Sequence, residues 1–180
     1  KSGFYSRVYG RESEEFRRVE TILTTHFSRG NVKVAEITAI YNKALLVSFV
    51  NQWKIMTTRK IQAPEHFFTC TYSKDGAKMA VMAYFQKMIL NFWPYNQDLQ
   101  VSLVPALHGT NQLVAEKIAQ TGFASLSSLD SGYYGKGIYF TTSILYTLPY
   151  ACMHREPALI LSYLNMGNVF PVTENHKGDK

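Results

Sequence analysis

The spacing of apolar residues changes near residue 100, and this change limits the folds that the chain can adopt. Before it, apolar side chains recur at intervals of three and four residues, as in Val81, Phe85 and Met88, which is the spacing of one helix face. After it, segment 158–164 is apolar almost without interruption, as buried strands are. Helices in the first part and most strands in the second predict an α+β fold.

The same patterns predict the individual elements. Expected helices cover residues 12–27, 44–56, 77–92, 111–121 and 143–153. Expected strands cover residues 32–41, 101–107, 135–142, 158–164 and 169–173. Segment 57–76 is expected to be irregular or to contain a short strand near residues 67–72.

The fourth expected helix has signals at both ends. Thr110 or Asn111 can cap its start, and Gly122 stands where a helix-ending residue with a positive φ angle belongs. Its inward face is expected to carry Leu113, Val114 and Ile118. In the fifth expected helix, Pro149 is expected to interrupt or bend the backbone.

Length and composition narrow the class of protein. The 180 residues favour one domain, and 46% hydrophobic residues are too many for a disordered tail. No apolar run reaches the roughly 20 residues that a bilayer-spanning helix needs. The net charge of +6 is compatible with nucleic acid or membrane partners. Because the charges are dispersed, a domain with a modest excess of lysine is the simpler interpretation.

Cysteine usage and the first residues indicate an intracellular protein, in the cytoplasm or nucleus. Cys70 and Cys152 lie far apart and have no CxxC spacing, so we expect neither a zinc site nor another metal. No apolar segment follows the basic start of the chain, as a secretory signal peptide would require. We therefore expect no membrane association.

Three motifs carry chemistry, and the first is His108-Gly109-Thr110 at the end of an expected strand. A glycine lets a ligand approach the main chain closely, because no Cβ is in the way. A histidine ring nitrogen can donate to a sugar hydroxyl. Alone, such a pair is more often structural.

The second motif lies in residues 132–142, where three glycines alternate with three tyrosines: Tyr133, Tyr134 and Tyr139. A bulge or hairpin with aromatic packing would explain it. Gly135-Lys136-Gly137 lacks the third glycine of the dinucleotide-binding fingerprint, so a phosphate loop of that kind is rejected.

The third motif is Thr147-Leu148-Pro149-Tyr150. Tyr150 can face Tyr139 across a cleft, and two tyrosine rings separated by the thickness of a ligand clamp a flat heterocycle. The Thr147 hydroxyl and the main chain of Gly109 can then hold an amide. Either tyrosine can instead belong to the core.

Together, the motifs resemble the catalytic domain of the poly(ADP-ribose) polymerase family, within the diphtheria-toxin-like ADP-ribosyltransferases. The resemblance is close from Leu107 to about Thr173 and looser over residues 16–53. It implies a single domain over residues 1–180, with two packed, mostly antiparallel sheets and flanking helices. It also implies transfer of ADP-ribose from NAD⁺, without a metal, to a protein or nucleic acid acceptor, with release of nicotinamide.

The resemblance also assigns roles to residues. His108 and Tyr139 would be catalytic. His108 would bind the adenine-side ribose, and the main chain of Gly109 and the Thr147 hydroxyl would bind the carboxamide of nicotinamide. Tyr150 and Tyr139 would stack on opposite sides of the nicotinamide ring. The full set of implied NAD⁺-binding residues is His108, Gly109, Thr110, Tyr133, Tyr134, Tyr139, Thr147 and Tyr150, with residues 125–131 as the loop beside the adenosine.

One departure from the family concerns the third catalytic residue, a glutamate on a late strand. Glu174 comes too early for that strand, and Glu156 is in a turn. We therefore expect a domain that lacks its last strands. The alternatives are a catalytically inactive module that binds NAD⁺, ADP-ribose or a partner protein, and an NAD⁺ glycohydrolase. Transfer of single units or of polymer stays open.

Overall fold

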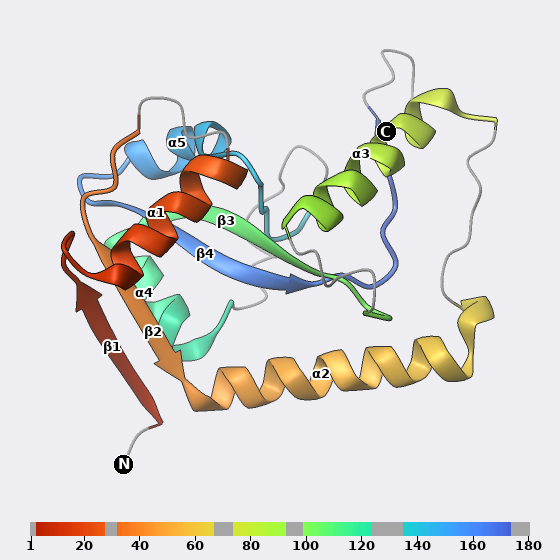
Figure 1. The fold of residues 1–180 in the computed structure, drawn as a ribbon, viewed down its shortest axis with the longest axis horizontal. Coiled ribbons are helices and arrows are strands. Elements are labelled where there is room, and N and C mark those ends of the chain that lie inside the picture. Colours follow the sequence, from red (N-terminus) through yellow and green to blue (C-terminus); the bar gives the residue numbers. More distant parts are fainter. Residues whose placement is uncertain (1–2, 28–31, 67–73, 93–98, 124–134, 174–180) are drawn as a thin grey trace. The chain divides into compact units, whose positions relative to one another are not determined.

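A computed structural model describes residues 3–27, 32–66, 74–92, 99–123 and 135–173, and the fold is α+β, as the sequence predicts (Figure 1). The chain divides into two compact units. Unit 1 comprises Lys1–Phe49 and Pro105–Ser162, and unit 2 comprises Val50–Val104 and Tyr163–Lys180. The single domain expected from chain length stays a prediction.

Unit 1 begins with a strand, a helix and a second strand. β1 (Phe4–Tyr9) and β2 (Ile37–Asn42) pair antiparallel, with Tyr5 opposite Tyr41. Between them lies α1 (Glu14–His26), which confirms the helix expected at 12–27. The strand expected at 32–41 is wrong for residues 32–36, which precede β2 without regular structure. β1 was not predicted.

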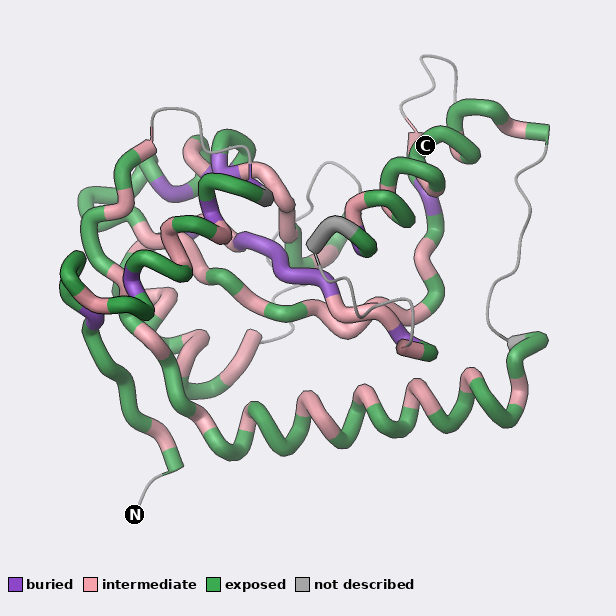
Figure 2. The backbone as a smooth tube through the Cα atoms, in the orientation of Figure 1, coloured by how far each residue is buried: buried purple, intermediate pink, exposed green. Residues whose placement is uncertain are grey.

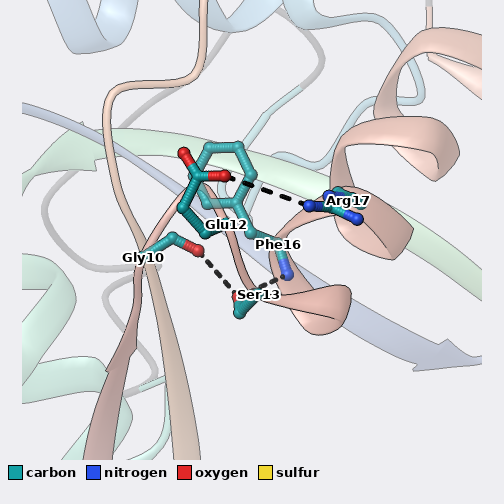
Figure 3. Close-up of polar contacts among 5 residues, drawn as sticks. All are labelled: Gly10, Glu12, Ser13, Phe16 and Arg17. Atoms are coloured by element: carbon teal, nitrogen blue, oxygen red, sulfur yellow. Dashed lines mark hydrogen bonds and ion pairs between the residues drawn. The ribbon is translucent and has the colours of Figure 1, made fainter.

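The start of α1 is closed by a side-chain cap. The Ser13 hydroxyl accepts a hydrogen bond from the Phe16 amide at 3.2 Å and donates to the Gly10 carbonyl at 2.7 Å (Figure 3). Glu12 and Arg17 form an ion pair at 4.0 Å, but both side chains are exposed, so its contribution is small. Phe16, Leu23 and Phe27 are buried and form the α1 part of the core.

The helix expected at 44–56 is longer in the structure. α2 covers Lys43–Gln62 and is followed by a short 3₁₀ helix, η1 (Pro64–His66). The expectation of irregular structure from residue 57 is therefore wrong as far as residue 62. The sequence after Met56 is mostly polar and has no apolar residues at helical spacing, so the pattern did not indicate a helix there. The helix continues because these residue types do not prevent helix formation. Residues 67–72 lie outside the described residues.

β3 (Leu103–Asn111) and β4 (Pro157–Asn165) form the second two-stranded sheet. Hydrogen bonds from Gln112 to Glu156 and from Met166 to Ser102 show that it is antiparallel. The strand expected at 158–164 is confirmed, and the one expected at 101–107 runs instead from residue 103 to residue 111. Residues 104–107 are buried, and Figure 2 shows this run in purple.

Two other expected strands are wrong. Within residues 135–142 only Thr141 forms a bridge, to Leu107, because the backbone bends at residues 135–137 and Gly135 has a φ angle of +102°. Residues 169–173 form no strand in the structure. Both described sheets therefore have two strands each, fewer than the implied fold suggests.

α4 (Gln112–Thr121) follows β3 directly, with the Asn111 side chain as its cap and Gly122 at a φ angle of +84°, both as expected. The expectation that Leu113 faces inward is wrong, since its side chain is exposed. Val114 and Ile118 are half-buried. α5 (Ile144–Cys152) confirms the helix expected at 143–153 and contains Pro149.

Unit 2 contains α3 (Gly76–Phe92), as expected at 77–92. Ile89 is buried, but Val81 is exposed, so the apolar stripe is only partly core. The Trp53 indole donates to the Val101 carbonyl at 3.0 Å. No helix in the described part of the chain has both the length and the apolarity needed to cross a bilayer.

Candidate functional site

The first feature of the site is a close contact between β3 and α5. A Cβ atom added to Gly109 would lie 2.6 Å from the Thr147 carbonyl oxygen and 3.2 Å from the Thr147 Cβ. From the sequence, we expect a glycine here so that a ligand can approach the main chain. Packing against α5 alone already requires it. The structure thus brings together two of the residues that the motifs assign to one amide.

The main chain of Gly109 lies on the edge of β3 that faces away from β4. Leu107 exchanges two hydrogen bonds with Thr141, at 2.8 and 3.0 Å. Backbone groups of alternate strand residues point to the same side, so the N–H and C=O of Gly109 point this way too. Apart from the strand ladder, neither group has a backbone hydrogen bond to another described residue. One donor and one acceptor side by side match a primary amide.

The Thr147 hydroxyl is buried, with 2% of the residue exposed. It donates to the Ile144 carbonyl at 2.5 Å, one turn earlier in α5. Because its hydrogen is used in this bond, the oxygen is left with acceptor capacity. Toward an amide ligand Thr147 is therefore an acceptor for N–H.

The tautomer of His108 follows from one hydrogen bond. Its Nδ1 lies 2.9 Å from the Tyr139 carbonyl oxygen, which can only accept. Nδ1 therefore carries the hydrogen, and in the neutral ring Nε2 is an acceptor. From the sequence, we expect His108 to donate to a sugar hydroxyl. The geometry favours the reverse, with the hydroxyl donating to Nε2.

Two phenylalanines surround the His108 ring, and the sequence argument missed both. The Phe123 ring meets it edge-on at 5.3 Å, and the Phe140 ring is tilted against it at 5.7 Å. The two phenylalanine rings contact each other at 5.0 Å. Phe123 follows Gly122 and Phe140 follows Tyr139 in the sequence, but neither position indicates a contact with His108. Together they restrict the orientation of the histidine ring.

The two tyrosines expected to form a clamp are placed separately. The Tyr139 hydroxyl donates to the Gly135 carbonyl at 2.7 Å, which closes residues 135–139 into a compact loop. Tyr150 lies on α5, one turn after Thr147, and is 59% exposed. In the region that the structure describes, no ring contact joins the two tyrosines. A clamp between them stays a prediction.

The remaining site residues are only partly described. Thr110 is buried in β3. Tyr133, Tyr134, Glu174 and the loop at 125–131 lie outside the described residues. Glu156 is exposed, and its carbonyl accepts from the Gln112 amide. Across the described ranges no group of three histidine, cysteine or acidic side chains that could hold a metal ion is found.

Comparison with known proteins does not extend this picture: no protein-family model and no curated protein matches the chain. The candidate site therefore consists of Gly109, Thr147 and His108, within the residue pattern that contains them.

Proposed function

We propose that the chain is a catalytic domain of an intracellular ADP-ribosyltransferase of the poly(ADP-ribose) polymerase type. It takes NAD⁺ as co-substrate, requires no metal, and transfers ADP-ribose to a protein acceptor, or to nucleic acid, as nicotinamide is released. The supporting pattern is the combination of His108-Gly109, Tyr139, Thr147 and Tyr150 in one chain.

One observation carries the proposal: Gly109 packs closely against Thr147, because a Cβ at Gly109 would lie 2.6 Å from the Thr147 carbonyl oxygen, and the Thr147 side chain is buried. Gly109 offers one donor and one acceptor, and Thr147 offers a second acceptor. A primary carboxamide has one acceptor oxygen and two N–H donors, so its hydrogen-bonding groups match this set. Nicotinamide carries such a carboxamide.

The reaction depends more on the orientation of bound NAD⁺ than on a covalent bond between NAD⁺ and the protein. The bond between nicotinamide and the ribose C1′ breaks with its electrons leaving on nicotinamide, and an acceptor nucleophile bonds to C1′ and loses its proton. Positive charge builds on the ribose, as in glycoside hydrolysis. Holding the amide at Gly109 and a ribose hydroxyl at His108 lowers the entropic part of the barrier. A carboxylate near C1′ would stabilise the charge.

A second function, binding without catalysis, is favoured by the chemistry of the three residues at the site. His108, Gly109 and Thr147 bind and orient, and none of them is a carboxylate. The same geometry therefore suits a module that binds NAD⁺ or ADP-ribose without turnover. Incubation with labelled NAD⁺, with and without protein acceptors, separates transfer, hydrolysis to free ADP-ribose, and binding alone.

Binding of a primary amide at Gly109 and Thr147 is tested with a nicotinamide mimic. Calorimetric titration of the full chain with 3-aminobenzamide should give binding, and Thr147→Val should weaken it about two- to tenfold, the scale of one hydrogen bond. The N,N-dimethyl amide, which has no N–H, should not bind.

Thr21→Val is the matched control, because Thr21 makes the same kind of bond to its own helix, from its hydroxyl to the Arg17 carbonyl at 2.8 Å. Equal affinity of Thr147→Val and native protein, or equal binding of both amides, would contradict the proposal.

A further inference from the structure

The sheet of β1 and β2 carries an exposed pair of tyrosines. Tyr5 and Tyr41 stand opposite each other in the register, and their rings stack at 4.4 Å with an angle of 10° between them. Tyr5 is 60% exposed and Tyr41 39%. Stacked rings that remain this open leave the outer π-face available to a further flat group.

The same side of the sheet carries two cations, one on each side of the tyrosine pair. Arg7 follows Tyr5 by two residues in β1, and alternate strand residues share a face. Lys43 follows Tyr41 by two residues, and its amide donates to the Gly3 carbonyl at 2.9 Å. The Lys43 Cβ lies 3.2 Å from the place of a Cβ on Gly3, so it continues this face. We call Tyr5, Arg7, Tyr9, Tyr41 and Lys43 the tyrosine face.

Tyr9 holds the other side chains of the tyrosine face in place. The hydroxyls of Tyr9 and Tyr41 lie 2.9 Å apart, and this bond raises the pKa of Tyr9, so its hydroxyl stays neutral. The Arg7 guanidinium lies 5.2 Å from the centre of the Tyr9 ring, a cation–π contact. Tyr9 is buried. The ring of Tyr41 is thereby fixed, and Tyr5 is the outermost ring of the stack.

We infer that the tyrosine face binds single-stranded nucleic acid, with a base stacked on Tyr5 and phosphates beside Arg7 and Lys43. Aromatic rings that stack bases, combined with cations that follow the backbone, are the means by which proteins bind single strands without sequence preference. Along the strands, the Cα atoms of Arg7 and Lys43 are about 7 Å from those of Tyr5 and Tyr41, which is the rise of two strand residues. The chain's net charge of +6 favours a polyanion.

Fluorescence anisotropy of the full chain with a labelled 12-nucleotide oligo(dT) tests the stacking. Tyr5→Leu removes the π-face but keeps apolar bulk, and it should weaken binding about 5- to 150-fold. Tyr5→Phe keeps the ring and should bind as the native protein does. Tyr84→Leu, on α3 with 69% exposure, is the matched control and should also bind normally. Native affinity in Tyr5→Leu would overturn the inference.

Salt dependence tests the phosphate contacts. Arg7→Gln and Lys43→Gln should each lower the slope of log K against log salt by about 0.7, the value for one phosphate contact on a single strand. A duplex of equal length should bind more weakly, because its bases are already stacked.

Unchanged slopes, or equal affinity for the duplex, would contradict the inference. Sedimentation that shows a dimer dissociated by Tyr5→Leu would instead assign the face to a second copy of the chain. The outcome is independent of NAD⁺ binding at Gly109.

Discussion

At the scale of single residues, Gly109 shows a packing requirement at a position for which we also propose a ligand contact. Its N–H and C=O lie on the edge of β3 that bridges to Thr141, while the place of its missing Cβ is next to the backbone of Thr147. A backbone oxygen 2.6 Å away cannot move as the end of a flexible side chain can. The glycine is therefore fixed by α5 before any ligand binds.

Gly109→Ala should consequently destabilise the fold by about 1–3 kcal/mol, the usual cost of overpacking. Urea unfolding followed by circular dichroism measures this. Gly137→Ala is the control, because nothing lies within 4 Å of a Cβ there and its φ angle is not positive. Equal loss of stability in both variants would show that the contact with Thr147 costs nothing.

Tyr150 is the exposed aromatic residue beside Thr147 on α5. If it stacks on nicotinamide, Tyr150→Ala should weaken binding of 3-aminobenzamide by about 1–3 kcal/mol, the scale of aromatic stacking on a base. Its side chain is 59% exposed, so the substitution should leave stability nearly unchanged. Calorimetry gives the affinity, and Tyr84→Ala serves as a control of the same residue type. An unchanged affinity would remove Tyr150 from the site.

At the scale of elements, Asn42 joins two helices through one side chain. Its Oδ1 accepts from the Leu45 amide at 3.1 Å and so caps α2. Its Nδ2 donates to the carbonyls of Ala119 and Gln120, at 3.0 and 2.9 Å, at the end of α4. Helix ends leave such groups without intrahelical partners, so both helices depend on this residue.

Asn42→Ala should cost more stability than Asn111→Ala, which removes one cap worth about 1 kcal/mol. Asn42→Asp keeps the acceptor for Leu45 but loses both donated bonds, so it should fall between native protein and Asn42→Ala. Thermal unfolding ranks the variants. If Asn42→Asp were as stable as the native protein, the hydrogen bonds from Asn42 to α4 would contribute nothing to stability.

The elements that the sequence predicted are those with a regular apolar period or a marked end. α3 was found from its period, and α4 from Asn111 and Gly122. β1 was missed, because six residues with mixed polarity give no distinct signal. The prediction of a strand at 135–142 was wrong because Gly135 adopts a positive φ angle. The residue types in this segment do not show that angle.

The site was predictable to the same extent. The motifs named Gly109 and Thr147, and the structure places them in contact. Phe123 and Phe140 were missed as neighbours of His108, because contacts between separate segments have no period in the sequence. The tautomer of His108 likewise depends on a carbonyl 31 residues away.

At the scale of the whole molecule, the border between the two units falls inside continuous elements. It crosses α2 between Phe49 and Val50, β3 between Val104 and Pro105, and β4 between Ser162 and Tyr163. When α2 loses its hydrogen bonds in one unit, the neighbouring ones in the other unit are weakened, because helix formation is cooperative. The units should therefore unfold together.

Binding at the site in unit 1 should then raise the melting temperature reported from unit 2. At 100 times Kd, a ligand stabilises the native state by about 2.7 kcal/mol. For a chain of this length that is a rise of roughly 5–10 °C. Far-ultraviolet circular dichroism reports both units, and the fluorescence of Trp53, compared with a Trp53→Phe variant, reports unit 2. With 3-aminobenzamide as ligand, both transitions should move together. A shift in one probe without the other would show that the units unfold separately.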